Sequence, residues 1–145
     1  MVDLNEITRN VLQRGYLLSV GIADADGPWV ADVIYTFDDE CNIYWMSTPE
    51  RRHSMAIALN AKIAGAITVT PAPGIPDLGL QMSGEAKVID DIPFEIVLRY
   101  FRKRNQPDPL PTDDVLDEHK WYKFTPSRIE LIDQERFAYN RQRVR

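Results

Sequence analysis

The chain has 145 residues, a length typical of one domain, and a formal net charge of −5 at pH 7, which argues against a nucleic-acid-binding module with its usual basic stripe. The single cysteine, Cys41, excludes an internal disulfide, and the two histidines, His53 and His119, are too few for most metal clusters, so we expect no metal site. No apolar run approaches the roughly 20 residues of a membrane span and the N-terminus lacks signal-peptide features, so we expect a cytoplasmic protein that does not associate with membranes.

The first part of the chain predicts a short helix followed by strands. The helix begins after Asp3 and ends near Gly15, because apolar residues recur at helical spacing between these two residues. The period then changes to alternation over residues 18–22, 29–37 and 43–46, with turn residues between the runs. Three consecutive strands with short turns predict an antiparallel meander.

A second helix is expected directly after the third strand. Thr48 is a suitable N-cap residue, Pro49 suits the first helical position, and the helical pattern extends to Asn60. Arg51 and Arg52 would then lie in the first turn, where cations are normally disfavoured by the helix dipole. A bound anion at this helix start would remove the conflict.

The middle of the chain predicts two strands and a third helix. The strands cover residues 64–70 and 80–89, and Gly84 marks a bulge or bend in the second of them. The helix after Pro93 carries apolar residues at i, i+3, i+4 and i+7, which leaves Lys103 and the neighbouring arginines on the opposite side and at the C-terminal end.

The last part predicts a loop, two strands and a tail. The loop over residues 107–118 is acidic and rich in proline; strands cover 121–124 and 128–133, and residues 138–145 form a basic tail that we expect to be mobile. The whole pattern predicts a mainly β (α+β) single domain over residues 1–145. It would be an antiparallel split β-barrel of six or seven strands with about three short flanking helices. Its surplus apolar sheet face needs a helix, a cofactor or a second subunit to cover it.

Chemistry-bearing residues concentrate between Met46 and Ser54. This segment holds three hydroxyls, two guanidinium groups and an imidazole where a strand gives way to a helix start. Convergent donors and free helix amides are what a phosphate group requires. The alternative is a capped surface helix with solvated arginines.

Four passages together resemble the split-barrel flavin-binding proteins related to pyridoxamine 5′-phosphate oxidase. The likeness covers Gly15 to about Phe137. The passages are the strand pair Trp29–Asp38 and Asn42–Ser47, the Arg52-His53-Ser54 helix start with Asn60–Ala64, the segment Leu80–Ala86, and the segment Trp121–Glu130. The second strand carries Asp32 where the oxidase has a basic residue. Because an aspartate beside a phosphate would be repulsive, we expect Asp32 to face elsewhere. The oxidase's C-terminal Arg-His motif is also absent. Pyridoxamine phosphate is therefore not the expected substrate.

The resemblance implies a homodimer that binds flavin mononucleotide (FMN) between its subunits. It assigns Ser47, Thr48, Arg52, His53 and Ser54 to the phosphate, with Arg51 facing solvent. It places the backbone of Val33, Ile34 and Tyr35 along the edge of the isoalloxazine ring. Gln81 would hydrogen-bond the ring system from the other subunit, and Trp121 would lie near the ring.

Three classes of function follow as hypotheses. The first is an FMN-dependent oxidoreductase acting on an unidentified small molecule, because a flavin supplies the hydride chemistry and no protein nucleophile is needed. Tyr35, Gln81 and the 107–118 loop are candidate substrate-side groups, and no catalytic residue is identified. The second is a carrier or sensor of flavin, deazaflavin or haem without turnover, with His53 or His119 as the axial ligand of a haem. The third is an interaction domain without a cofactor.

Overall fold

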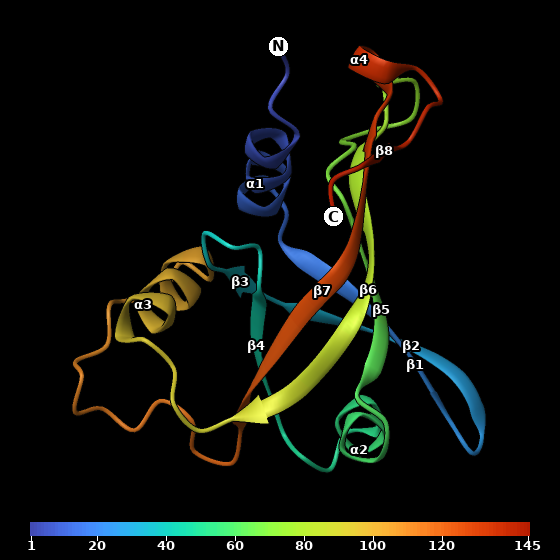
Figure 1. The fold of residues 1–145 in the computed structure, drawn as a ribbon. Coiled ribbons are helices and arrows are strands. Elements are labelled where there is room, and N and C mark those ends of the chain that lie inside the picture. The colour runs from blue at the N-terminus through green and yellow to red at the C-terminus, as the bar shows by residue number, and fades with distance from the viewer.

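The computed structural model describes residues 1–145 as an eight-stranded antiparallel sheet with four helices (Figure 1). The elements are α1 (Leu4–Arg14), β1 (Leu17–Asp24), β2 (Gly27–Ile34), β3 (Thr36–Phe37), β4 (Ile43–Ser47), α2 (Arg52–Leu59), β5 (Lys62–Thr68), β6 (Leu78–Ile89), α3 (Phe94–Lys103), β7 (Lys120–Asp133), α4 (Gln134–Phe137) and β8 (Gln142–Arg143). The expected mainly β, α+β split barrel is confirmed, with one strand and one short helix more than predicted. None of the helices has the length and apolar character needed to cross a membrane.

The two end strands of the sheet, β2 and β3, are joined in the chain by a single residue, Tyr35. The strand order of the sheet is β2-β1-β5-β6-β7-β4-β3, with β8 paired to β7, so the first and last strands of the order are neighbours in the chain. The predicted meander is therefore only partly correct, because β2 pairs with β1 whereas the residues after Tyr35 pair with β4.

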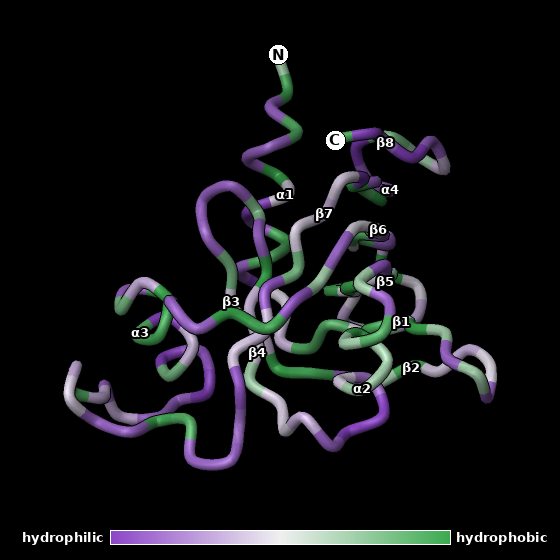
Figure 2. The backbone as a smooth tube through the Cα atoms, turned by 60° about the horizontal axis from the view of Figure 1, so that its bottom comes forward, coloured by the Kyte–Doolittle hydropathy of each residue, from purple (hydrophilic) through white to green (hydrophobic).

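The barrel interior is filled by the inward-facing residues of these strands. Burial alternates strictly along β5, from exposed Lys62 through buried Ile63 to exposed Thr68, as a half-buried strand requires. Leu18, Val20 and Phe124 belong to the same cluster of 22 buried apolar residues. Figure 2 shows hydrophobic segments meeting where the strands cross, whereas the β1–β2 turn and most of the loop beside α3 are hydrophilic.

One backbone carbonyl joins α1, the barrel and α3. The carbonyl oxygen of Leu12 accepts hydrogen bonds from the Tyr35 hydroxyl and from Lys103 Nζ, each at 2.8 Å. The Lys103 ammonium also lies 3.9 Å from the centroid of the Tyr35 ring. Placing Lys103 on the solvent side of its helix was therefore wrong, because the buried stripe of α3 runs through Ile96 and Tyr100 and reaches Lys103 one turn later.

β7 is one continuous strand, contrary to the prediction of two strands separated by a turn at residues 125–127. Pro126 pairs with Gly84, at the point where the register of β6 and β7 shifts after Ser83. A proline cannot donate a ladder hydrogen bond and is tolerated in a sheet at such a bulge. The predicted irregularity at Gly84 is confirmed, and it accommodates the proline of the facing strand.

The C-terminal segment lies against the sheet. Gln142 pairs with Leu131 and Arg143 with Glu130, which forms β8 on residues 138–145 that we expected to be a mobile tail. Arg145 also donates to the Glu40 carbonyl at 2.8 Å. The basic segment thus contacts the turn between β3 and β4.

We expect Gly84→Ala to destabilise the fold. An added Cβ would lie 2.8 Å from Pro126 Cα and 2.9 Å from Ser127 N, both of them backbone atoms that cannot move aside cheaply. Overpacking of this kind costs about 1–3 kcal/mol, which chemical denaturation would measure. Gly21→Ala is the matched control, since its Cβ would meet Ala64 Cβ at 3.6 Å, an ordinary contact. Equal stability of both variants would contradict the role of the bulge.

Tyr35→Phe tests the contact with the Leu12 carbonyl. Tyr35 is fully buried, so the loss of its hydrogen bond should lower the free energy of unfolding by about 0.5–1.5 kcal/mol in denaturant titration. Tyr139→Phe, at a position where 89% of the residue is exposed, should leave stability unchanged. A Tyr35→Phe protein as stable as the parent would show that the hydrogen bond contributes nothing.

Candidate functional site

A cavity of about 420 Å³ lies where β2, β4 and the start of α2 approach α3. It contains five of the ten residues predicted to bind a cofactor, namely Val33, Ile34, Ser47, Thr48 and His53. The other lining residues are Leu17, Asp32, Met46, Arg51, Tyr100, Arg104 and His119. The cavity therefore joins an apolar strand surface to a group of polar side chains.

The polar side of the cavity includes the N-terminus of α2. This helix begins at Arg52, with Arg51 as an N-cap residue that makes no side-chain capping bond. The prediction of Thr48 as the cap was wrong, because Thr48 and Pro49 belong to a turn before the helix. The amides of residues 52–54 consequently have no acceptor within the chain, which makes this helix start a potential anion site.

Ser47 and His53 form a buried polar pair in the cavity wall. Ser47 Oγ lies 3.0 Å from His53 Nε2, and both residues are less than one-tenth exposed. Burial, together with the positive charge of Arg51, lowers the pKa of His53, so the imidazole is neutral at pH 7. Ser54 is enclosed in α2, and its hydroxyl has no hydrogen-bond partner and does not line the cavity.

The guanidinium of Arg52 is engaged elsewhere. Its Nε and Nη2 atoms donate to the Asp24 carboxylate at 2.8 and 2.9 Å, and its Cζ lies 4.5 Å from the centroid of the Trp29 ring. This hydrogen bond lowers the pKa of Asp24. Arg51 is exposed as expected, but it also lines the cavity and makes no ion pair. The free guanidinium at this helix start thus belongs to Arg51.

Besides Arg52 and Ser54, three further predicted residues do not line this cavity. The Tyr35 side chain points into the barrel core, which leaves no free hydroxyl for a substrate. Trp121 is buried and packs edge-on against Tyr100, with ring centroids 5.0 Å apart, so it lies behind the cavity wall. Gln81 is exposed on β6, three strands from β2, which at about 4.8 Å per step corresponds to about 14 Å.

Three polar or charged lining residues lie outside the set that the sequence predicted to bind FMN, although His119 was a candidate haem ligand. Asp32, which we expected to face elsewhere, lies on the cavity wall and accepts a hydrogen bond from Ser19 Oγ at 2.6 Å. His119 reaches the cavity because Ser47 pairs with Lys120, which brings the residue before Lys120 next to Thr48. Arg104 comes from the C-terminal end of α3. Only the strand pairing could have revealed His119, and no local pattern marks Arg104.

The fold is shared with solved structures of low sequence identity, whereas no protein-family model and no curated protein matches the chain. The "Putative Pyridoxamine 5'-phosphate oxidase" of Listeria innocua is 17% identical, with a TM-score of 0.70 over 90% of this chain and 98% of that one. A heme binding protein of Mycobacterium smegmatis is 11% identical, with a TM-score of 0.75 over 99% of this chain and 58% of that one. An F420 reductase is 18% identical, with a TM-score of 0.62 over 83% and 94%. These likenesses confirm the split-barrel fold.

We expect Arg52→Ala and Asp24→Asn each to lower the melting temperature, because the bidentate ion pair joins the start of α2 to the β1–β2 hairpin. The double variant should be hardly less stable than either single variant, since both changes remove the same interaction. Arg51→Ala should leave the melting temperature unchanged. Additive losses in the double variant would show that the two side chains act independently.

Proposed function

We propose that this protein binds FMN in the cavity at the start of α2 and acts as a flavin-dependent oxidoreductase of the pyridoxamine 5′-phosphate oxidase-like class. The observation that carries the proposal is a set of donors on one wall, of which all but His53 have no acceptor within the protein. Thr48, Arg51 and His53 accompany three free helix amides, and this donor set suits a phosphate dianion. The low-identity neighbours support the class and leave the substrate, a small molecule, unspecified.

The rest of the cavity suits the ring of a flavin. Val33, Ile34 and Met46 supply apolar surface beside the polar wall, and Tyr100 adds an aromatic ring backed by Trp121. Ligand sites are typically apolar clefts with a few convergent polar groups, and this cavity has that composition. The residues present therefore fit a molecule with a flat ring at one end and a phosphate at the other.

The bound flavin would supply hydride transfer, and the protein would supply position and electrostatics. The neutral imidazole of His53 can take up a proton when a dianion binds beside it. The Asp32 carboxylate disfavours a phosphate near itself and so helps to orient the cofactor. Burial of the Ser47–His53 pair keeps the imidazole fixed and excludes water from its ring.

A homodimer would complete the site. Leu17, Trp29 and Val30 on the β1–β2 hairpin are each more than two-fifths exposed, an apolar surface that suits contact with a second subunit. In its own chain, Gln81 lies three strands from β2 and two strands from β4, and it does not line the cavity, so we assign it to the cofactor of the partner subunit. Light scattering at micromolar concentration should therefore report a dimer.

The direct test is the absorbance of freshly purified protein and its titration with FMN. Arg51→Ala should weaken FMN binding by about 1.5–3 kcal/mol, the scale of a hydrogen bond to a charged group. Arg14→Ala, which removes the same charge from α1, is the control. Colourless protein that fails to bind added FMN would refute the proposal. If Arg52→Ala weakens FMN binding and Arg51→Ala does not, the phosphate is bound by Arg52, as the family resemblance implies.

FMN binding should be accompanied by proton uptake at pH 7. The pKa of free His53 is lowered, and a phosphate beside the imidazole raises it again, so the complex holds a proton that the free protein does not. Calorimetry in two buffers of different ionisation enthalpy would measure the uptake. Riboflavin, which has no phosphate, and the His53→Asn variant should both show none. Equal uptake with riboflavin would place the phosphate away from His53.

Haem is a second candidate because of the geometry of His119. Its Nδ1 lies 3.1 Å from the Leu116 carbonyl, which leaves Nε2 free in a residue that lines the cavity. An imidazole whose other nitrogen is fixed by a carbonyl is the usual arrangement of a metal ligand. Titration with haem should then give a spectrum that is lost in His119→Ala and retained in His53→Ala. No spectral change on titration would exclude haem.

A further inference from the structure

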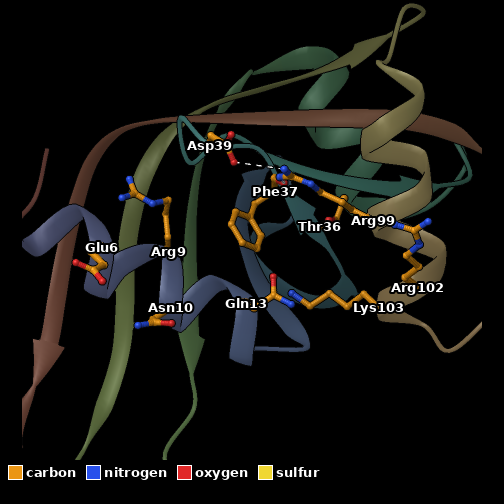
Figure 3. A pocket seen from close by; sticks show the side chains of 10 residues that line it. All are labelled: Glu6, Arg9, Asn10, Gln13, Thr36, Phe37, Asp39, Arg99, Arg102 and Lys103. Carbon is orange, nitrogen blue, oxygen red and sulfur yellow. Dashed lines mark hydrogen bonds and ion pairs between the residues drawn. The ribbon is translucent and has the colours of Figure 1, made fainter.

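A second cavity, of about 610 Å³, lies between α1 and α3 over the short strand β3 (Figure 3). It shares no lining residue with the cavity at the start of α2. Figure 3 shows Arg99 and Lys103 extending from α3 toward α1, one on each side of the Phe37 ring in that view, with Arg9 and Gln13 on the facing helix.

The walls of this cavity carry more positive than negative charge. Four of its lining residues are cations and two are carboxylates, Glu6 and Asp39. Asp39 pairs with Arg99 at 3.4 Å, and Arg102 pairs with Asp108, which does not line the cavity. Arg9 and Lys103 therefore have no carboxylate partner within the protein.

Two of the cations are held in place before any ligand binds. Arg99 Nη1 donates to the Phe37 carbonyl at 3.0 Å, and Lys103 Nζ donates to Leu12 while it lies over the Tyr35 ring. Lys103 Nζ retains further N–H donors beyond the one that it gives to Leu12. The side chains of Arg9 and Gln13 make no hydrogen bond within the protein, so they remain available to a ligand.

The half-buried Lys103 ammonium has lost part of its hydration and has no carboxylate counter-ion to compensate for it. Burial lowers the pKa of Lys103 to about 8, because the charged form loses hydration. An anion placed beside the Lys103 ammonium would offset that loss. The volume of the cavity lies within the range of small-molecule sites, roughly 300–1,000 Å³.

We propose that the cavity between α1 and α3 binds a small molecule through a phosphate or carboxylate group, held by Arg9, Arg99 and Lys103. This site is separate from the proposed FMN site, but α3 lines both. Tyr100 and Arg104 of that helix face the first cavity, whereas Arg99 and Lys103 face the second. The cavity is thus a second ligand site on a helix that also borders the proposed cofactor.

Calorimetric titration with two probes, inorganic pyrophosphate and citrate, at constant ionic strength tests the proposal. At least one should bind saturably, and the tighter of the two identifies the group recognised. Arg9→Gln should weaken that binding at least tenfold without loss of stability, because Arg9 makes no interaction that the fold needs. Arg14→Gln, which removes the same charge from the same helix outside the cavity, should bind as the parent does. No saturable binding, or equal losses in both variants, would overturn the proposal.

Backbone amide shifts in an NMR titration locate the bound anion. Shifts centred on residues 9–13 and 99–103 support the proposed site. Shifts confined to residues 47–54 would place the anion at the start of α2 and overturn it. Lys103→Gln is the second variant, and it should weaken binding at a temperature where circular dichroism shows it folded. A folded Lys103→Gln protein with parental affinity would remove Lys103 from the site.

Discussion

The carbonyl oxygen of Leu12 is the point on which the arrangement of this protein depends. It accepts from Tyr35 at the seam of the barrel and from Lys103 of α3, so one acceptor fixes three elements far apart in the sequence. The acceptor lies in the last turn of α1, where free carbonyls carry the negative end of the helix dipole and favour a cation such as Lys103. Both cavities lie beside α3, and the position of α3 rests in part on this contact.

Patterns of neighbouring residues predicted which helices and strands form, whereas residues distant in the sequence determine where some of the strands begin and end. The cap at Asp3 and the stop at Gly15 were correct because they depend on residues within a few positions. Tyr35 could not be identified as the seam, because apolar alternation continues through it without interruption and only the pairing of its neighbours with β1 and β4 reveals the change. The segment around Pro126 was predicted as a turn because the bulge that accommodates this proline lies at Gly84, on the neighbouring strand β6.

The candidate site likewise contains residues that the sequence predicted and residues that only tertiary contacts bring to it. Ser47, Thr48 and His53 are close in sequence, and Val33 and Ile34 reach the same cavity from β2. The sequence could not show that Arg51, and not Arg52, has the free guanidinium at the start of α2. Arg52 is held by Asp24 and Trp29 of the β1–β2 hairpin, and this contact is visible only in the folded protein. Arg104 and His119 enter through tertiary contacts, for which neighbouring residues give no signal.

The C-terminal strand has a consequence for solubility. β4 pairs with β7 only up to Phe124, so the second half of β7 would present a row of unpaired backbone groups on that side. β8 covers part of this row at Glu130 and Leu131. An uncovered strand edge is a template on which another chain can add a strand, and so a starting point for aggregation. The segment therefore covers the open side of the longest strand, and its basic residues place like charges opposite each other when two such edges meet.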